Sequence, residues 1–155
     1  MRSTPALDLE LDHQLCFALY DASRAMIRAY GPLLSELGLT YPQYITMLVL
    51  WEAPDAVPVG TIGTRLHLST STLTPLLKRL ESLELLRRDR DPEDERRVLV
   101  TLTSAGEELR DRATTIPCEI GARLGLDVAE EERLRDTLRL VAHSLDADAP
   151  PVDPA

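Results

Sequence analysis

Apolar residues recur at intervals of three or four along most of the chain, a pattern that predicts a largely helical protein. They keep this spacing from Leu11 to about Leu37, and Gly38 is a natural stop for the helix they predict. The pair Gly31-Pro32 lies inside this stretch and predicts a bend in the helix.

Two shorter helices are predicted next. Thr40-Tyr41-Pro42 opens the first, because a proline at an early helical position has no N–H to lose, and Ala53-Pro54-Asp55 ends it. The second runs from Val59 or Gly60 to Leu66.

A fourth helix is predicted to begin between Ser69 and Thr72, since Pro75 is tolerated only near a helix start. One face of this helix is apolar and carries Leu73, Leu76, Leu77 and Leu80. The opposite face is polar and carries Ser71, Thr74, Lys78 and Arg79.

The pattern then changes to two short strands. Residues 85–89 and 97–102 flank the charged, turn-like segment 90–96, which predicts a hairpin. Thr103 or Ser104 caps a helix that runs towards Leu124 and is interrupted at Pro117. A last helix over 129–145 has an apolar stripe of Leu134, Leu138, Val141 and Leu145.

Length and composition predict one soluble domain over residues 11–145, with a flexible N-terminus at 1–10 and a disordered tail at 146–155. The N-terminal residues lack the apolar stretch of a secretory signal, and the longest apolar run, at 47–51, is too short to span a bilayer. We therefore expect a cytoplasmic protein without a membrane partner, whose two cysteines are thiols.

Charge is unevenly distributed along the chain. The net charge is −9, yet residues 65–97 hold eight lysines and arginines against seven acids. A segment of this kind can still present a local basic face to nucleic acid.

The order of short helix, turn, polar-faced helix and charged hairpin is typical of a winged helix-turn-helix. Short hydroxyl side chains at a helix N-terminus reach base edges or phosphates in the major groove, and an arginine at a hairpin tip reaches the minor groove. Each piece alone has a plainer interpretation, as a helix cap or a solvated turn. Together they predict DNA contacts by Ser69, Thr70, Ser71, Thr72, Thr74, Lys78, Arg79, Arg88 and Arg96.

Three segments resemble MarR-type repressors. Residues 66–81 (LHLSTSTLTPLLKRLE) are similar to the recognition region of that family, and residues 94–103 (DERRVLVTLT) to its wing. Residues 15–20 (LCFALY) narrow the resemblance to the organic hydroperoxide resistance regulators.

The resemblance implies a mainly α fold with a small β-hairpin wing. It also implies a homodimer on palindromic double-stranded DNA, with a winged-helix unit at about 40–102 and dimerisation helices at 11–37 and 103–145. Asp94 and Arg96 inherit the role of holding the wing.

Cys16 lies in an apolar helical pattern and is either a small core residue or a chemical sensor. A sensor requires a stabilised thiolate, because the thiolate and not the thiol attacks a peroxide. Tyr20 follows four residues later on the same helical face. In the family, tyrosines of both subunits meet the reactive cysteine, and Tyr20, Tyr30 and Tyr41 match those positions, which leaves Tyr44 as a core residue.

Cys118 is the candidate resolving thiol, since two-cysteine members of the family form a disulfide between subunits. The alternative is an inert Cys118, with a small thiol capping the oxidised Cys16. The apolar residues Phe17, Leu19, Met26, Leu48 and Trp51 either line a pocket for an organic peroxide or form plain core. His13, His67 and His143 lack metal-site spacing around the cysteines, so neither a metal nor another cofactor is predicted.

The sequence thus predicts a repressor that binds DNA when reduced and releases it when an organic hydroperoxide oxidises Cys16, which derepresses a peroxide-detoxification gene. One alternative is a MarR-type repressor released by a small aromatic ligand. A thiol peroxidase is disfavoured, because such an enzyme has no need of a recognition helix and wing.

Overall fold

The computed structural model describes residues 9–147 and confirms the predicted fold class, a mainly helical chain with a small antiparallel sheet. A single 3-10 turn at Leu11–His13 precedes the first α-helix. The elements that follow are α1 (Leu15–Glu36), α2 (Tyr41–Glu52), β1 (Val57–Pro58), α3 (Val59–Leu66), α4 (Thr70–Ser82), β2 (Leu86–Arg90), β3 (Val98–Leu102), α5 (Ser104–Ala113), α6 (Ile116–Leu124) and α7 (Val128–Ala147).

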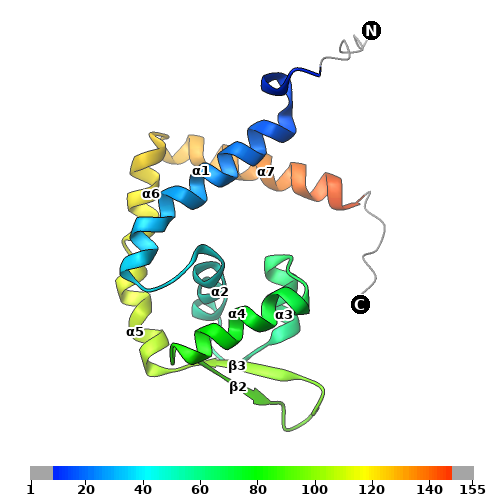
Figure 1. Cartoon of the computed structure of the whole chain (residues 1–155), viewed down its shortest axis with the longest axis vertical. Helices are drawn as coiled ribbons and strands as arrows, with labels where there is room; N and C mark the ends of the chain where they lie inside the picture. Colours follow the sequence, from blue (N-terminus) through cyan, green and yellow to red (C-terminus); the bar gives the residue numbers. More distant parts are fainter. Residues whose placement is uncertain (1–8, 148–155) are drawn as a thin grey trace.

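The elements form two groups at opposite ends of the molecule (Figure 1). We call residues 41–102 the winged half; it holds α2, α3, α4 and the sheet, with β2 and β3 projecting as the wing. We call α1, α6 and α7 the helical half. Helix α5 joins the two, because it follows β3 and leads into α6.

The sheet has three strands in the order β1-β3-β2, all antiparallel. Leu86 pairs with Leu102 at the base of the wing, and Arg90 pairs with Val98 near its tip. Strand β1, which the sequence pattern did not predict, has two residues, and its Val57 pairs with Val100. This third strand ties the start of α3 to the wing.

The core of the winged half is built from α2, α3, α4 and the sheet. Met47, Ile62 and Leu80 are fully buried, and Leu80 belongs to the apolar face predicted for α4. Trp51 donates a hydrogen bond of 2.8 Å from Nε1 to the carbonyl oxygen of Gly106. Gly106 is required there, because a Cβ at this position would collide with the carbonyl oxygen of Leu85.

The predicted start of the first helix at Leu11 is wrong. Gln14 is extended (φ −87°, ψ 121°), and α1 begins after it, at Leu15. Leu11 and Leu15 are four residues apart and fit helical spacing, but the backbone turns between them. The helix then continues through Pro32 to Glu36.

The C-terminal boundaries also differ from the prediction. The expected helix from 103 towards 124 is two helices, broken at Thr114 and Thr115, and Pro117 lies in the first turn of α6 instead of at the break. Helix α7 extends through Asp146 and Ala147, which the prediction assigned to a disordered tail. The rest of that tail and residues 1–8 lie outside the described residues. None of the helices in the described part of the chain is long and apolar enough to cross a membrane.

Candidate nucleic-acid interface and thiol sites

A tight turn joins α3 to α4 and fixes the angle between them. His67 ends α3 in the left-handed conformation (φ 53°), and the N–H of Leu68 donates to the carbonyl oxygen of Gly63 at 2.9 Å. A side chain at Gly63 would lie 2.9 Å from the carbonyl oxygen of Leu68, so glycine allows this close approach. The turn places the N-terminus of α4 at the surface.

Hydroxyl groups cluster at that N-terminus. Ser69 caps α4 by accepting from the N–H of Thr72, and its Oγ lies 2.9 Å from that of Ser71. Thr74 donates to the carbonyl oxygen of Thr70 at 2.8 Å. The side chains of residues 69–72 are exposed and that of Thr74 is half-buried. Capping therefore uses part of their hydrogen-bonding capacity, and their exposed sides face solvent.

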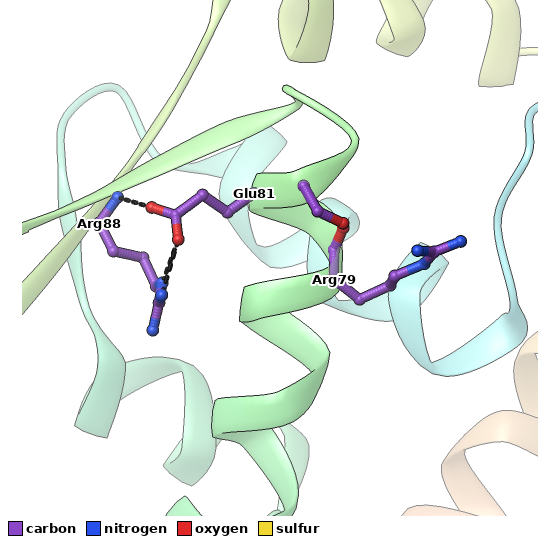
Figure 2. A network of polar contacts seen from close by, with 4 residues as sticks. Arg79, Glu81 and Arg88 are labelled. Atoms are coloured by element: carbon purple, nitrogen blue, oxygen red, sulfur yellow. Dashed lines mark hydrogen bonds and ion pairs between the residues drawn. The ribbon is translucent and has the colours of Figure 1, made fainter.

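Of the basic residues, Lys78 and Arg79 are exposed on α4. Arg88 differs, because its guanidinium is bound to Glu81 of α4 by Nε at 3.0 Å and Nη2 at 2.6 Å, and its backbone N–H donates to the same carboxylate at 3.1 Å (Figure 2). This hydrogen bonding holds the pKa of Glu81 below its usual value. Figure 2 shows Arg79 leaving α4 on the side away from this pair.

The DNA contact by Arg88 stays a prediction, and this geometry gives its side chain a structural role as well. Its side chain is 23 % exposed and donates two hydrogen bonds to Glu81, and its backbone N–H donates a third to the same carboxylate. The contact ties β2 to the recognition helix α4, so Arg88 positions the helix relative to the wing.

The wing turn is held by two aspartates. Asp94 accepts from the N–H of Arg96 at 3.1 Å, so the predicted pair exists, but as a side chain bound to backbone and not as an ion pair. The ion pair of the wing is Asp91 with Arg97, at 3.4 Å. Asp91 also accepts from the N–H of Glu93 at 3.0 Å and is buried. The sequence analysis missed its role.

A hollow of about 750 Å³ lies between α3, α4 and the wing. We call it the arginine hollow, because Arg65, Arg88, Arg96 and Arg97 line it together with Thr61, Thr64, Thr70 and Thr74, and no acidic residue does. Arg65 and Arg97 were not predicted to belong to the interface. They lie about thirty residues apart in the sequence, and only the fold brings them together.

Cys16 is exposed and lies in the first turn of α1. Gln14 accepts the first hydrogen bond of this helix, from the N–H of Ala18 at 3.2 Å. The N–H groups at the start of a helix lack partners within it and carry a partial positive charge, an environment that favours an anion. The later start of α1 therefore moves Cys16 from a helix interior to a helix N-terminus.

The predicted tyrosines do not converge on Cys16 within one chain. The Tyr20 hydroxyl accepts from Arg24 at 3.2 Å, and the Arg24 guanidinium lies 5.4 Å from the centre of the Tyr20 ring. Tyr30 instead packs edge-on against Tyr41, with ring centres 5.1 Å apart.

Tyr44 completes this aromatic cluster, with its ring centre 5.7 Å from that of Tyr30, and is buried in the core as predicted. Burial, aided by the neighbouring tyrosines and Glu131, raises the pKa of Tyr30 to about 12. Among the described residues, the hydroxyls of Tyr30 and Tyr41 have no hydrogen-bond partner.

Cys118 is also exposed and lies in the first turn of α6, directly after Pro117. Both cysteines are free thiols. Within residues 9–147, His, Cys, Asp and Glu side chains form no group of three that could hold a metal ion.

The apolar residues predicted around Cys16 do not form one pocket. Trp51 belongs to the core of the winged half, where it packs against Tyr44 with ring centres 6.4 Å apart and binds Gly106. Met26 packs against the same core, and Phe17 and Leu19 are half-buried. Leu48 is 38 % exposed.

The helical half carries most of the exposed large apolar side chains. Leu15 is 66 % exposed on α1, and Leu140 and Leu145 are 66 % and 67 % exposed on α7. The predicted apolar stripe of α7 is also exposed, with Leu134 46 % and Leu138 42 % exposed. Such a surface is typical of an interface with another chain.

Comparison with known proteins places the chain among transcriptional regulators. The family model described as "Transcriptional regulator SarA/Rot" matches residues 28–113. The organic hydroperoxide resistance transcriptional regulator of Bacillus subtilis (strain 168) is 46 % identical over 127 residues, covering 82 % of this chain and 84 % of that protein. The HTH-type transcriptional regulator TtmR of Methylorubrum extorquens (strain PA1) is 46 % identical over 139 residues, covering 90 % of this chain and 71 % of that protein.

Solved structures give the same result. Reduced AbfR bound to DNA matches with a TM-score of 0.78 at 33 % identity, covering 88 % of this chain and 93 % of that one. Disulfide-formed AbfR matches with a TM-score of 0.60 at 34 % identity, covering 88 % of this chain and 90 % of that one. AbfR is a protein of Staphylococcus epidermidis. The chain therefore overlays better on the reduced, DNA-bound form of this relative than on its disulfide form.

Proposed function

The chain belongs to the MarR-type transcriptional regulators, in the group of the organic hydroperoxide resistance regulators, and from this premise we propose that oxidation of Cys16 switches its DNA binding. The observation that carries the proposal is the exposed Cys16 thiol in the first turn of α1. The thiolate is the form of a cysteine that attacks a peroxide, and the exposure of Cys16 gives a peroxide access to its sulfur.

The chemical step is a displacement at oxygen. The Cys16 thiolate attacks the terminal oxygen of an alkyl hydroperoxide, an S–O bond forms and the O–O bond breaks. The leaving alkoxide takes a proton and departs as the alcohol, so the sulfur is oxidised and the peroxide reduced. Cys16 becomes a sulfenic acid.

Resolution uses the second thiol of the chain. The Cys118 thiolate of a second copy attacks the sulfenic sulfur, an S–S bond forms, and hydroxide leaves and is protonated to water. A disulfide requires the two Cα atoms to lie within about 7 Å, so its formation constrains α1 of one copy against α6 of the other. The lower TM-score with disulfide-formed AbfR than with reduced, DNA-bound AbfR supports a change of shape on this step.

The tyrosines act across the dimer in this proposal. Tyr30 lies fourteen residues after Cys16 on the same helix, about 21 Å along its axis, too far for contact within one chain. The hydroxyls of Tyr30 and Tyr41 have no partner among the described residues and can donate to the Cys16 thiolate of a second copy. Tyr20, one turn after Cys16, completes the set.

The proposed homodimer covers the exposed apolar residues of the helical half. Leu15, Leu140 and Leu145 are each about two-thirds exposed in a single chain, and a second copy would bury such side chains. Two copies then present two recognition helices to a palindromic operator. The proposed DNA contacts are Ser69, Thr70, Ser71, Thr72, Thr74, Lys78 and Arg79 on α4, with Arg96 on the wing.

The test is DNA binding before and after oxidation. The reduced protein first selects its operator from a pool of random duplexes, and fluorescence anisotropy then follows that operator during addition of cumene hydroperoxide. We expect the wild type to release the operator, which is the event that would derepress the regulated gene, and Cys16→Ser to retain it. Release by Cys16→Ser on addition of the hydroperoxide would contradict the proposal.

Cys118→Ser separates sensing from resolution. This variant should still form the sulfenic acid at Cys16, but without the disulfide between subunits, which non-reducing electrophoresis detects. If Cys118→Ser forms the same cross-linked dimer as the wild type, Cys118 is not the resolving thiol.

A further inference from the structure

Four arginines from three separate segments of the chain line the arginine hollow. Arg65 comes from α3 and Arg88 from β2, while Arg96 and Arg97 end the wing turn before β3. The residues that line the hollow include no carboxylate. The chain as a whole carries a net charge of −9, so this cationic surface contrasts with the rest of the protein.

Three of these arginines are each bound to a carboxylate that does not line the hollow. Arg65 pairs with Glu52 of α2 at 2.6 Å, Arg88 with Glu81 at 2.6 Å, and Arg97 with Asp91 at 3.4 Å. The side chains of Arg65 and Arg97 are nevertheless 52 % and 53 % exposed. Arg88, at 23 %, is held by three hydrogen bonds, and its exposure is less than half that of Arg65.

A guanidinium has five N–H donors, and one carboxylate contact uses only part of them. The remaining donors of Arg65 and Arg97 have room in the arginine hollow for a second anion. The anion that a winged-helix protein meets on this face is the phosphate of the DNA backbone, which guanidinium groups bind well.

We propose that Arg65 and Arg97 bind DNA phosphates, and that Glu52 and Asp91 hold them in a binding orientation while reducing their attraction for DNA. The proposal rests on DNA binding by the winged half, and it does not depend on oxidation of Cys16. Glu52 competes with phosphate for Arg65, because both are anions that use the same donors. The protein thereby keeps its binding to DNA of arbitrary sequence weak.

The test uses reduced protein and a duplex of unrelated sequence, so that sequence-specific contacts with bases do not contribute to the measured affinity. Anisotropy gives the binding constant at several KCl concentrations, and the slope of its logarithm against the logarithm of salt counts the phosphates neutralised. Arg65→Gln should make this slope shallower by about 0.9 per subunit, or about 2 for a dimer. Arg65→Lys keeps the charge and should keep the slope.

Arg139→Gln is the matched control. Arg139 also pairs with a single carboxylate, Asp136 at 3.6 Å, and is 72 % exposed, but it lies on α7 in the helical half. Its substitution should leave the slope at the wild-type value. Circular dichroism of each variant verifies that the fold is intact.

Glu52→Gln tests the second part of the proposal. Removing the competing carboxylate should tighten binding to the unrelated duplex by about threefold, as expected for loss of an exposed ion pair. Weaker binding by Glu52→Gln would overturn the competitive role of Glu52. An unchanged salt slope in folded Arg65→Gln, or an equal change in Arg139→Gln, would overturn the phosphate site. A wild type that shows the expected slope but does not respond to hydroperoxide contradicts the redox function alone.

Discussion

The two halves of the molecule differ in how completely they bury their own apolar side chains. In the winged half, Met47, Ile62 and Leu80 are fully buried within one chain. In the helical half, α7 buries none of its large apolar residues, and Val128 is 75 % exposed. The winged half thus buries its core within one copy, whereas the helical half leaves apolar side chains exposed that the proposed second copy would cover.

This difference has a consequence for function. The residues proposed to contact DNA lie in the winged half, whose core is buried within one chain. Both cysteines lie in the helical half, in the first turns of α1 and α6, on the helices that the proposed second copy would contact. The proposed sensing residues and the proposed DNA contacts therefore lie in parts of the molecule that bury their apolar side chains to different extents.

The largest expected effect is the loss of stability caused by a cavity in the core of the winged half. Met47→Ala should lower the free energy of unfolding by about 2–5 kcal/mol, because the Met47 side chain is fully buried. Leu48→Ala, one residue along the same helix and 38 % exposed, is the control and should cost less. Urea unfolding measures both, and equal losses would contradict the burial described for α2.

The next largest expected effect is weaker dimerisation through the helical half. Leu138→Asp places a charge on the exposed stripe of α7 and should weaken the dimer by about a hundredfold or more, since two apolar side chains per dimer lose their burial. Sedimentation measures the dissociation constant, with Arg139→Gln as the control at the adjacent position. A Leu138→Asp protein that remains as tightly dimeric as the wild type would show that α7 is not at the interface.

A smaller effect follows from the pKa of Tyr30, which is raised from 10 to about 12 in the folded protein. The folded form binds the Tyr30 hydroxyl proton more tightly than the unfolded form. The contribution of this difference to the free energy of unfolding is therefore present below pH 10 and is lost as the pH rises towards 12. Unfolding midpoints in this range should fall less steeply for Tyr30→Phe than for the wild type. Tyr20→Phe, which removes an exposed hydroxyl outside this aromatic cluster, is the control variant.

The smallest expected effect is the loss of stability when the contact between Glu81 of α4 and Arg88 of the wing is removed. The folded pKa of Glu81 is lowered, so the stability from its contact with Arg88 is present above the ordinary carboxyl pKa and is lost as the pH falls through the lowered value. Glu81→Gln should cost up to about 1 kcal/mol at neutral pH, because the pair is partly exposed. The cost should vanish in acid, and a cost that persists there would rule out the ionic origin of the contact.

Local signals predicted much of the winged half. The start of α4 followed from the capping preference of Ser69 and the position of Pro75, and Ser69 is indeed the cap. Strand β1 was missed because it has two residues, one of them a proline, and too short a length to show alternation. The break at Gln14 was missed because Leu11 and Leu15 keep helical spacing across it.

The interface was harder to predict for a different reason. An arginine in a strand has the same sequence pattern whether it contacts DNA or a carboxylate seven residues earlier, and Arg88 is bound to Glu81. Arg65 and Arg97 join one hollow only after α3 packs beside the wing. Such contacts between distant segments depend on tertiary structure, which local periodicity does not encode.

We propose that chemistry at Cys16 in the helical half controls DNA binding by the winged half. The most direct measurement titrates cumene hydroperoxide into the reduced protein–operator complex, and follows DNA release by anisotropy and the Cys16 oxidation state by mass spectrometry in the same samples. We predict that release and Cys16 oxidation rise together with peroxide, and that Cys16→Ser shows no release. Release that precedes Cys16 oxidation, or that persists in Cys16→Ser, would contradict the claim.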